Sequence, residues 1–483
     1  MGKLKNKMVG SLFLLMAQCC NGQNASFPHI SINGDTSFIK DSIRKFCITS
    51  IILTGNKITR GNMILKETPF KKGDSIPATD FIPQLRLARQ QIYNLALFVD
   101  VEVNLRVMNA HDITITIDVK ERWYLYPVPQ FQPVDRNFNE WIKTYKGSLD
   151  RVNYGVKFVD FNLTGRKDQL RIYLINGYTR NISFSYSNPY SSHSLDEGFS
   201  LFAGYSQNHE ISYKTSYENK ILEYNKGDFA RNNAFGGVGY SIRQGLFKRH
   251  YFSISYTHFT VDDSIITVNY NPHYFNSPVA SKGLIDLIYR FQYTNVNNVS
   301  YPLQGTTSFV QVSKRNLGLS GNVNMFGMEA GWNTYYPLVK NWYASIQVTG
   351  KIKLPFEQAY INQRGLGYGD TYLRGLEYYV IDGVATALVK STIKKKIYYF
   401  SIPFPFHSRT ITSIPFTMYA KTYADIGYSY NKKTYDTYLN NRFLYTGGFG
   451  LDILTLYDIN LRIEYSFNQL HENGLFLHTQ AGF

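Results

Sequence analysis

The feature that most constrains the fold is an alternation of apolar and polar residues, which recurs in short segments from residue 123 to the C-terminus. Ile182, Phe184 and Tyr186 alternate with serines, and residues 252–256 repeat the pattern. A period of two is that of a β-strand with one apolar face. The chain has no run of about 18 apolar residues, the length that a membrane-spanning helix needs. We therefore predict that this part of the chain is built of β-strands.

A soluble β-sandwich would show the same alternation, so other features must distinguish it from a transmembrane barrel. The segments are about ten residues long, and aromatic pairs such as Tyr335-Tyr336 and Trp342-Tyr343 stand at their ends. The chain is 16% aromatic and only 18% charged, whereas an average soluble domain is about 25% charged. Only helices and closed barrels satisfy every backbone polar group in lipid. These features predict an all-β transmembrane barrel of about 16 antiparallel strands over residues 123–483.

The N-terminus has the pattern of a secretory signal. Three lysines precede an apolar stretch from Met8 to Ala17, which small and polar residues follow. The stretch is too short to cross a bilayer, as expected for a cleaved signal peptide. We predict a signal peptide over residues 1–22 and a linker over residues 23–45. Cys47 is then the last remaining cysteine, which excludes an intramolecular disulfide and a thiolate metal site.

Residues 46–122 have the pattern of one small α+β domain. A strand is followed by two helices and two further strands, so the predicted sheet has three strands. The longer helix carries Leu85, Ala88, Ile92 and Leu95 at the spacing of a single buried stripe. Two helices against such a sheet form a compact unit with its own core.

The βααββ order of this domain, with Gly55-Asn56 and Gly73-Asp74 at its turns, resembles a POTRA domain. The resemblance implies a place in the periplasm. Domains of this kind bind extended peptides by adding a strand to the edge of a sheet. A spacer that only orients the barrel is the alternative, and no side chain marks a peptide pocket that would decide between the two.

Two motifs in the barrel segment point to a family. The sequence Tyr372-Leu373-Arg374-Gly375 lies in a long segment between strands, and Asp425-Ile426-Gly427 lies on a later strand. The first resembles the Val/Ile-Arg-Gly-Phe/Tyr motif, and the second the Phe-x-Asp-x-Gly motif, of the BamA/TamA (bacterial surface antigen) family of outer-membrane assembly proteins. Residues 160–165 and 301–305 resemble lesser signatures in the family's early and middle strands.

In that family the Arg-Gly motif lies on the sixth extracellular loop, which folds back into the barrel, and its arginine pairs with the aspartate of the second motif. The resemblance therefore implies a pair between Arg374 and Asp425, with Gly427 beside it. A guanidinium offers a rigid fork of donors that a carboxylate accepts in bidentate geometry. Gly375 allows a close approach of two backbones.

The sequence also departs from the family pattern. Leu373 and Leu376 stand where the family has Val or Ile and an aromatic residue. In the family, the strand after the loop usually carries an Asn and a Glu, whereas residues 387–391 of this chain contain no acid. Only one POTRA-like unit is present. These departures indicate a specialised paralogue of the principal assembly factor.

The predicted first barrel strand contains Pro127, Pro129 and Pro133 at even spacing. Alternate residues of a strand direct their amides to the same edge, and proline has no amide hydrogen to donate. If the stretch is a strand, one edge cannot pair fully and forms a weak seam. A stiff, extended linker is the alternative.

The C-terminal segment, residues 474–483, alternates like a final barrel strand. It begins at Gly474, places Leu477 on its apolar face and ends at Phe483. A terminal aromatic residue on a last strand resembles the β-signal by which outer-membrane barrels are recognised for insertion.

The family resemblance implies a protein of a Gram-negative outer membrane that inserts polypeptides into that membrane or translocates them across it, through a plugged barrel with a lateral seam. Outer-membrane lipids and unfolded client polypeptides are the implied partners, and periplasmic chaperones or accessory lipoproteins are further candidates. Two other classes stay open. One is a passive porin or solute channel that favours anions, which needs neither a POTRA unit nor an Arg374–Asp425 pair. The other is a secreted adhesin with a soluble β-sandwich.

Nucleic-acid binding and enzymatic activity are not expected. The formal net charge is +16, but the basic residues are scattered and the longest run is Lys394–Lys396, whereas a nucleic-acid site gathers them on one face. The chain has no zinc-protease, nucleophile-elbow or Walker motif, each of which has a defined spacing. We therefore predict no catalytic residues, no cofactor and no metal.

Overall fold

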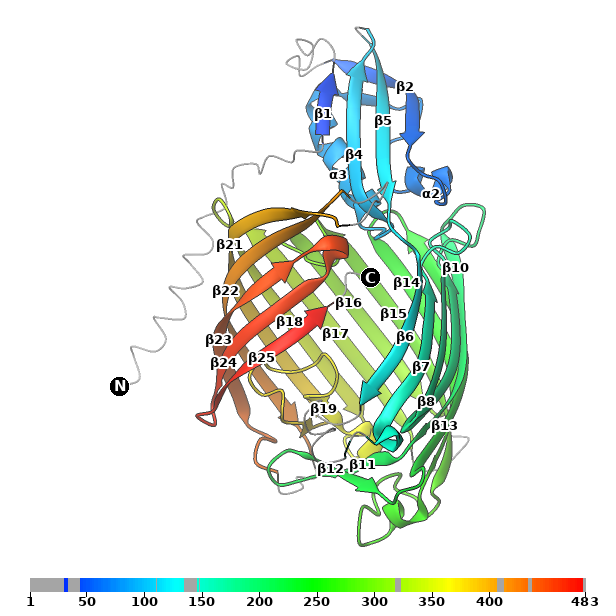
Figure 1. Ribbon diagram of the computed structural model, residues 1–483, viewed down its shortest axis with the longest axis vertical. Helices are drawn as coiled ribbons and strands as arrows, with labels where there is room; N and C mark the ends of the chain where they lie inside the picture. Colours follow the sequence, from blue (N-terminus) through cyan, green and yellow to red (C-terminus); the bar gives the residue numbers. More distant parts are fainter. Residues whose placement is uncertain are drawn as a thin grey trace, which may run out of the picture.

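A small α+β domain stands at one end of a large β-barrel in the computed structural model (Figure 1). The structure describes residues 30–33, 44–109, 111–133, 146, 148–317, 323–405, 412–432 and 437–480. The predicted signal peptide and Phe483 lie outside these residues. Among the helices of the described chain, none has the length and apolar character to cross a membrane.

The small domain has a five-stranded sheet in the order β1-β4-β5-β2-β3. Its elements are β1 (Ile30–Asn33), β2 (Lys45–Thr54), α2 (Gly61–Leu65), β3 (Ser75–Pro77), α3 (Phe81–Tyr93), β4 (Phe98–Val107) and β5 (Asp112–Glu121). The βααββ order is therefore present, but the sheet has two strands more than the three expected. β1 and β3, with four and three residues, are too short for a period of two to be visible in the sequence.

The sheet and α3 share one core. Leu85, Ala88 and Ile92 of α3 are at most 1% exposed, and they pack in one cluster with sheet residues such as Val101 and Ile115. Full burial of a side chain of the size of leucine or isoleucine contributes about 1.5–3 kcal/mol. The predicted stripe residues that lie on α3 thus face the sheet, whereas Leu95 follows the end of the helix and is buried in the same cluster. The domain has a hydrophobic core of its own.

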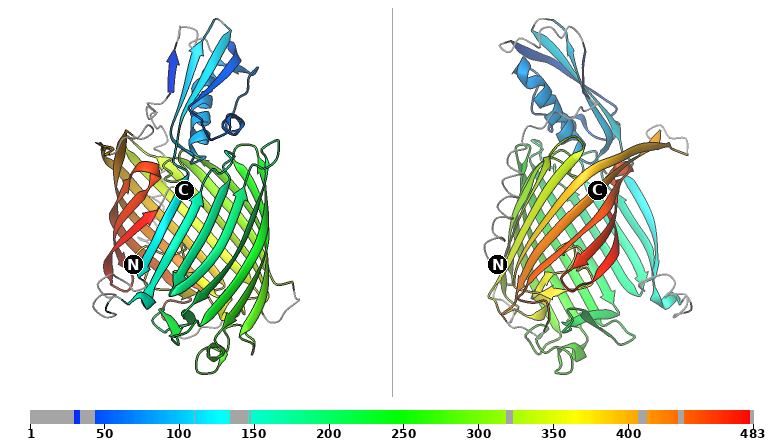
Figure 2. Two further views of the ribbon diagram at one scale, coloured as in Figure 1. Left: turned by 45° about the vertical axis from the view of Figure 1, so that its right-hand side comes forward. Right: turned by 90° about the vertical axis from the view of Figure 1, so that its left-hand side faces the viewer.

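The barrel is one 16-stranded sheet in which strands adjacent along the sheet run antiparallel. Its strands are β6 (Leu125–Pro133), β7 (Val152–Asp160), β8 (Gln169–Gly177), β9 (Thr179–Asn188), β10 (Glu197–Asn208), β13 (Arg231–Gln244), β14 (Lys248–Val261), β15 (Ser281–Val296), β16 (Gly305–Arg315), β17 (Met325–Pro337), β18 (Trp342–Leu354), β21 (Ala385–Pro403), β22 (Ser413–Tyr430), β23 (Phe443–Leu454), β24 (Asn460–Asn468) and β25 (Asn473–Gln480). The strands are tilted and curve into a wall (Figure 2). The predicted barrel and its number of strands are confirmed.

Apolar side chains cover the outside of this wall. Phe252, Ile254 and Tyr256 of β14 are 44%, 48% and 51% exposed, and the serines between them point the other way. Leu475 and Leu477 of β25 are exposed in the same manner. A continuous surface of large exposed apolar side chains is unfavourable in water and suits contact with lipid.

The connections differ between the two ends of the barrel. Near the small domain they are short, as in residues 245–247 between β13 and β14. The longest ones lie at the other end and comprise residues 209–230, which include the hairpin of β11 (Glu210–Thr215) and β12 (Ile221–Asn225), residues 262–280 and residues 355–384. Transmembrane barrels have short periplasmic turns and longer extracellular loops.

Two buried ion pairs fasten the small domain to the barrel. Arg243 of β13 donates two hydrogen bonds of 2.6 Å to the carboxylate of Glu67, which follows α2. Arg122 donates to Asp458, in the turn between β23 and β24, at 2.7 Å. The hydroxyl of Tyr93 also donates to Asp458, at 3.1 Å, and burial together with this carboxylate raises the pKa of Tyr93. The domain is therefore held against the rim at two separate points.

The substitution Glu67→Gln should loosen this docking. It leaves Arg243, whose side chain is 2% exposed, without a carboxylate partner. Removing one partner of a buried ion pair costs about 3–5 kcal/mol of stability. We expect spin labels on the small domain and the rim to show a broader distance distribution, while the barrel stays folded. Glu218→Gln is the control, because that side chain is 73% exposed. An equally narrow distribution in Glu67→Gln would show that the pair does not hold the domain.

Candidate functional site

The connection between β18 and β21, residues 355–384, folds back against the inner wall, and we call it the lumenal loop. It carries two short strands that pair with each other, β19 (Arg364–Leu366) and β20 (Ile381–Asp382). Its Leu373 packs in a buried cluster with Leu388 of β21. Figure 1 shows β19 within the ring of strands, toward the end away from the small domain.

Arg374 of this loop is bound to the wall by a buried network. Its Nε donates to Oδ2 of Asp425 on β22 at 2.9 Å, and its Nη2 donates to Oδ1 of the same carboxylate. The backbone amide of Arg374 donates to Oδ2 as well, at 3.0 Å. Nη1 donates to the hydroxyl of Thr392 and Nη2 to the carbonyl of Ser391. The guanidinium carbon lies 4.0 Å from the ring centroid of Tyr423, a distance suited to a cation–π contact.

The two motif glycines allow close contacts. Gly375 has a φ of +94°, and a Cβ at this position would lie 2.7 Å from Cβ of Ser466 on β24. A Cβ on Gly427 of β22 would lie 2.8 Å from the side chain of Leu373. A larger residue at either position would force the loop away from the wall.

Lys390 of β21 also contacts the motif. Its Nζ lies 4.2 Å from the ring centroid of Tyr372, so it makes a cation–π contact. The structure thus brings together Tyr372, Leu373, Arg374, Gly375, Asp425 and Gly427, the loop residues and partners singled out in the sequence.

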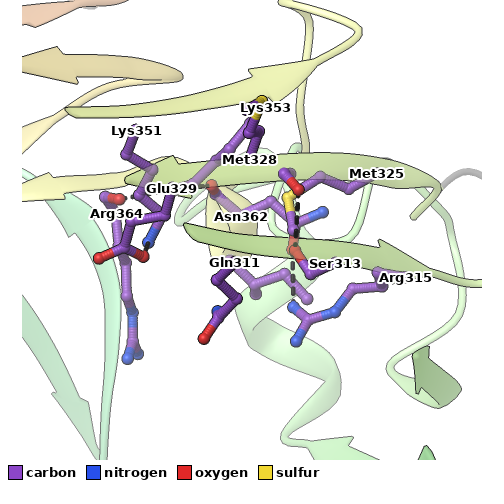
Figure 3. Close-up of a pocket in the computed structure, with 12 residues that line it drawn as sticks. Gln311, Ser313, Arg315, Met325, Met328, Glu329, Lys351, Lys353, Asn362 and Arg364 are labelled. Atoms are coloured by element: carbon purple, nitrogen blue, oxygen red, sulfur yellow. Dashed lines mark hydrogen bonds and ion pairs between the residues drawn. The ribbon is translucent and has the colours of Figure 1, made fainter. Parts of the chain in front are cut away.

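A second anchor of the lumenal loop lies at a cavity of about 250 Å³ beside β16, β17 and β18 (Figure 3). Lys353 of β18 donates to the backbone carbonyls of Asn362 and Arg364, at 2.6 Å each. Arg315 of β16 donates to the side chain of Asn362 at 2.8 Å and is itself paired with Asp286. The loop is therefore held to two separate stretches of the wall.

Sequence reasoning missed a buried charge network under the motif. Lys421 of β22 lies 2.5 Å from both Asp452 of β23 and Glu464 of β24. Lys394 and the hydroxyl of Tyr301 bind the other oxygen of Asp452. The alternation of β22 could have indicated that Lys421 faces inward, because Lys421 lies on the same face of the strand as Asp425. Its partners are on other strands and could not be assigned without the register.

Residues 160–165 and 301–305 lie mainly in turns at the small-domain end, not in strands as the resemblance suggested. The carbonyl of Gly165 accepts a hydrogen bond from the amide of Arg60 at 3.0 Å. A Cβ on Gly165 would lie 2.2 Å from the carbonyl oxygen of Ile58. The first of these segments therefore helps to dock the small domain, because only glycine allows this approach.

The sheet begins with β6 and ends with β25, and we call the boundary between these two strands the seam. Within the described residues, neither strand has a ladder partner on its outer edge. Both views of Figure 2 show β6 and β25 as the neighbouring ends of the wall. Gly474 and Leu477 lie on β25, and Phe483 falls outside the described residues.

The three prolines of β6 face the seam. Phe161 donates its amide to the carbonyl of Tyr124 at 3.1 Å, and the register of β6 with β7 is unbroken. Hydrogen-bonded and non-hydrogen-bonded residues alternate in an antiparallel pair, so even-numbered residues of β6 bond to β7. The odd-numbered residues of β6 direct their backbone groups to the open edge. Three of these residues are Pro127, Pro129 and Pro133, and proline has no amide hydrogen, so this edge lacks three hydrogen-bond donors.

Comparisons with known proteins support the fold. No family model matches the chain, and no curated protein matches its sequence. The structure resembles BamA from Haemophilus ducreyi lacking POTRA domains 1–3, with a TM-score of 0.50 and 15% identity over 90% of this chain and 84% of that one. CdiB from Escherichia coli has a TM-score of 0.54 and 12% identity, covering 90% of this chain and 75% of its own. The chain has the fold of a BamA-like β-barrel.

Proposed function

We propose that this protein inserts polypeptides into the outer membrane of a Gram-negative bacterium, or translocates them across it, as a member of the BamA/TamA family. Two observations support this proposal most: a loop bound to the inner wall at two places, and end strands β6 and β25 that have no ladder partner on their outer edges within the described residues. An unpaired strand edge is a template on which another polypeptide can add a strand. The three prolines keep the resident pairing of that edge weak.

The proposed partners follow from the surfaces. The exposed apolar wall is in contact with outer-membrane lipids, and unfolded client polypeptides meet the seam from the periplasmic side. The small domain is the periplasmic part, where chaperones or accessory lipoproteins also have access to it. No catalytic role is proposed for these buried charges, because they form balanced ion pairs. Arg374 of the loop pairs with Asp425, and Lys394 and Lys421 of the wall pair with Asp452 and Glu464.

Conductance in planar bilayers tests this proposal against a passive porin. A loop fixed to two stretches of the wall should give a closed or flickering pore. We therefore expect no large steady current from the purified protein. A large, steady and anion-selective conductance would contradict the proposal and favour the porin.

A further inference from the structure

Three side chains that could hold a metal ion meet where the lumenal loop touches the last two strands. They are Glu377 of the loop, Glu464 of β24 and His478 of β25, and each offers a ligand atom within 4.8 Å of the other two. Nε2 of His478 lies 3.0 Å from Oε2 of Glu377 and 3.6 Å from Oε2 of Glu464. Each of the three residues comes from a different element.

A second observation concerns Glu464 alone. Its side chain is 1% exposed, and its Oε2 has no hydrogen-bond partner in the described structure. The other oxygen, Oε1, accepts from Lys421 at 2.5 Å, which fixes the carboxylate and directs Oε2 toward His478. A buried carboxylate oxygen without a donor is costly, and an ion at this point would satisfy it.

The geometry suits a small divalent ion. Zinc lies about 2.0–2.2 Å from imidazole nitrogens and carboxylate oxygens, so that neighbouring ligand atoms of a tetrahedral site are about 3.3–3.6 Å apart. The two separations from His478, 3.0 and 3.6 Å, lie close to this value. Imidazole nitrogens and carboxylate oxygens are also ligands that zinc accepts.

We propose that Glu377, Glu464 and His478 bind one Zn²⁺ ion. The stacked ring of Tyr372, whose centroid lies 5.9 Å from that of His478, orients the imidazole, and Lys421 orients Glu464. A cavity of about 240 Å³ that borders Tyr372 and Glu464 gives water access to the fourth position. Second-shell contacts of this kind are typical of metal sites.

The bound ion ties the lumenal loop to β25, the end strand beside the seam. Other contacts already join the loop to β24 and to the turn before β25, since Asn468 donates to the carbonyl of Gly375 at 2.9 Å and Tyr379 to Glu472 at 2.7 Å. The ion adds a reversible cross-link to them. If the proposed function is correct, Zn²⁺ binding holds β25 against the loop and thereby slows the lateral movement of β25 at the seam.

Calorimetric titration of the full chain, without a histidine tag, with Zn²⁺ tests the site itself. We expect one equivalent to bind, and Co²⁺ to give the intense visible absorption of a tetrahedral site. His478→Ala and Glu377→Gln should each weaken binding at least about 10-fold, the lower end of what even the loss of a second-shell partner costs. The control His111→Ala, an exposed histidine of the small domain, should bind as the wild type does.

Binding that is absent, or that is unchanged in both variants, would overturn the proposal. It would leave His478 and Glu377 as an ion pair without a metal. These titrations do not depend on the proposed function. If Zn²⁺ binds as expected but does not change hydrogen exchange in β25, the metal site stands and its link to the seam fails.

Discussion

Replacing Arg374 with alanine should free the lumenal loop and convert a closed barrel into a conducting one. The fully buried carboxylate of Asp425 would lose both side-chain donors of Arg374 and keep the backbone amide. Removing one partner of a buried ion pair costs about 3–5 kcal/mol, or roughly 10²–10⁴-fold in the population of the anchored loop. We expect large, long-lived openings in planar bilayers in place of brief ones.

Arg364→Ala is the matched control for this variant. Arg364 lies in the same loop and its side chain is exposed. It contributes to the second anchor through its backbone carbonyl, which accepts from Lys353 and is retained in alanine. Arg374→Lys should give intermediate openings, because lysine keeps the charge but loses the bidentate fork. If Arg374→Ala conducts no more than the wild type, the pair with Asp425 does not hold the loop.

A disulfide across the seam should abolish function reversibly. In a Cys47→Ser background, cysteine pairs are scanned along β6 and β25, and a pair that oxidises fully is tested in cells depleted of the wild-type protein. A covalent bond that bridges the two end strands prevents the seam from opening. We expect the recovery of the outer-membrane or surface proteins that depletion lowers to fall at least 10-fold under oxidising conditions, and to return when a reductant is added.

The control for the seam disulfide joins strands that are already paired. Tyr465 of β24 and Leu475 of β25 face each other in the sheet. A disulfide between cysteines at these positions locks an existing ladder and should restore the lowered outer-membrane or surface proteins fully. Full rescue by the oxidised seam disulfide would contradict a role for lateral opening. Oxidation along the whole length of β6 and β25 in the resting protein would mean that the seam is already fully paired.

The strands could be predicted because the period of two is a local property of the chain. Each strand of a transmembrane barrel has one face toward lipid and one toward the lumen, and this arrangement requires the alternation of apolar and polar residues. Phe252 and Ile254 of β14 are examples of its exposed apolar residues. The Arg374–Asp425 contact was expected from two short motifs, and the structure places the two residues in bidentate contact. The function that we attach to this contact remains a proposal.

Other contacts could not be read from the sequence because they depend on register and docking. Glu67 and Arg243 are far apart in the chain and meet only when the small domain sits on the barrel. His478 and Glu377 are likewise far apart in the chain, and only the folding of the lumenal loop brings them into contact. β1 and β3 were missed because so few residues carry no periodic signal.

The most direct test of the central claim is the proteome of the outer membrane and cell surface after depletion of this protein. If it inserts or translocates polypeptides, a defined set of outer-membrane or surface proteins should fall several-fold, and re-expression of the wild type should restore them. An unchanged proteome, accompanied by a loss of uptake of small anions, would contradict the account and identify a solute channel.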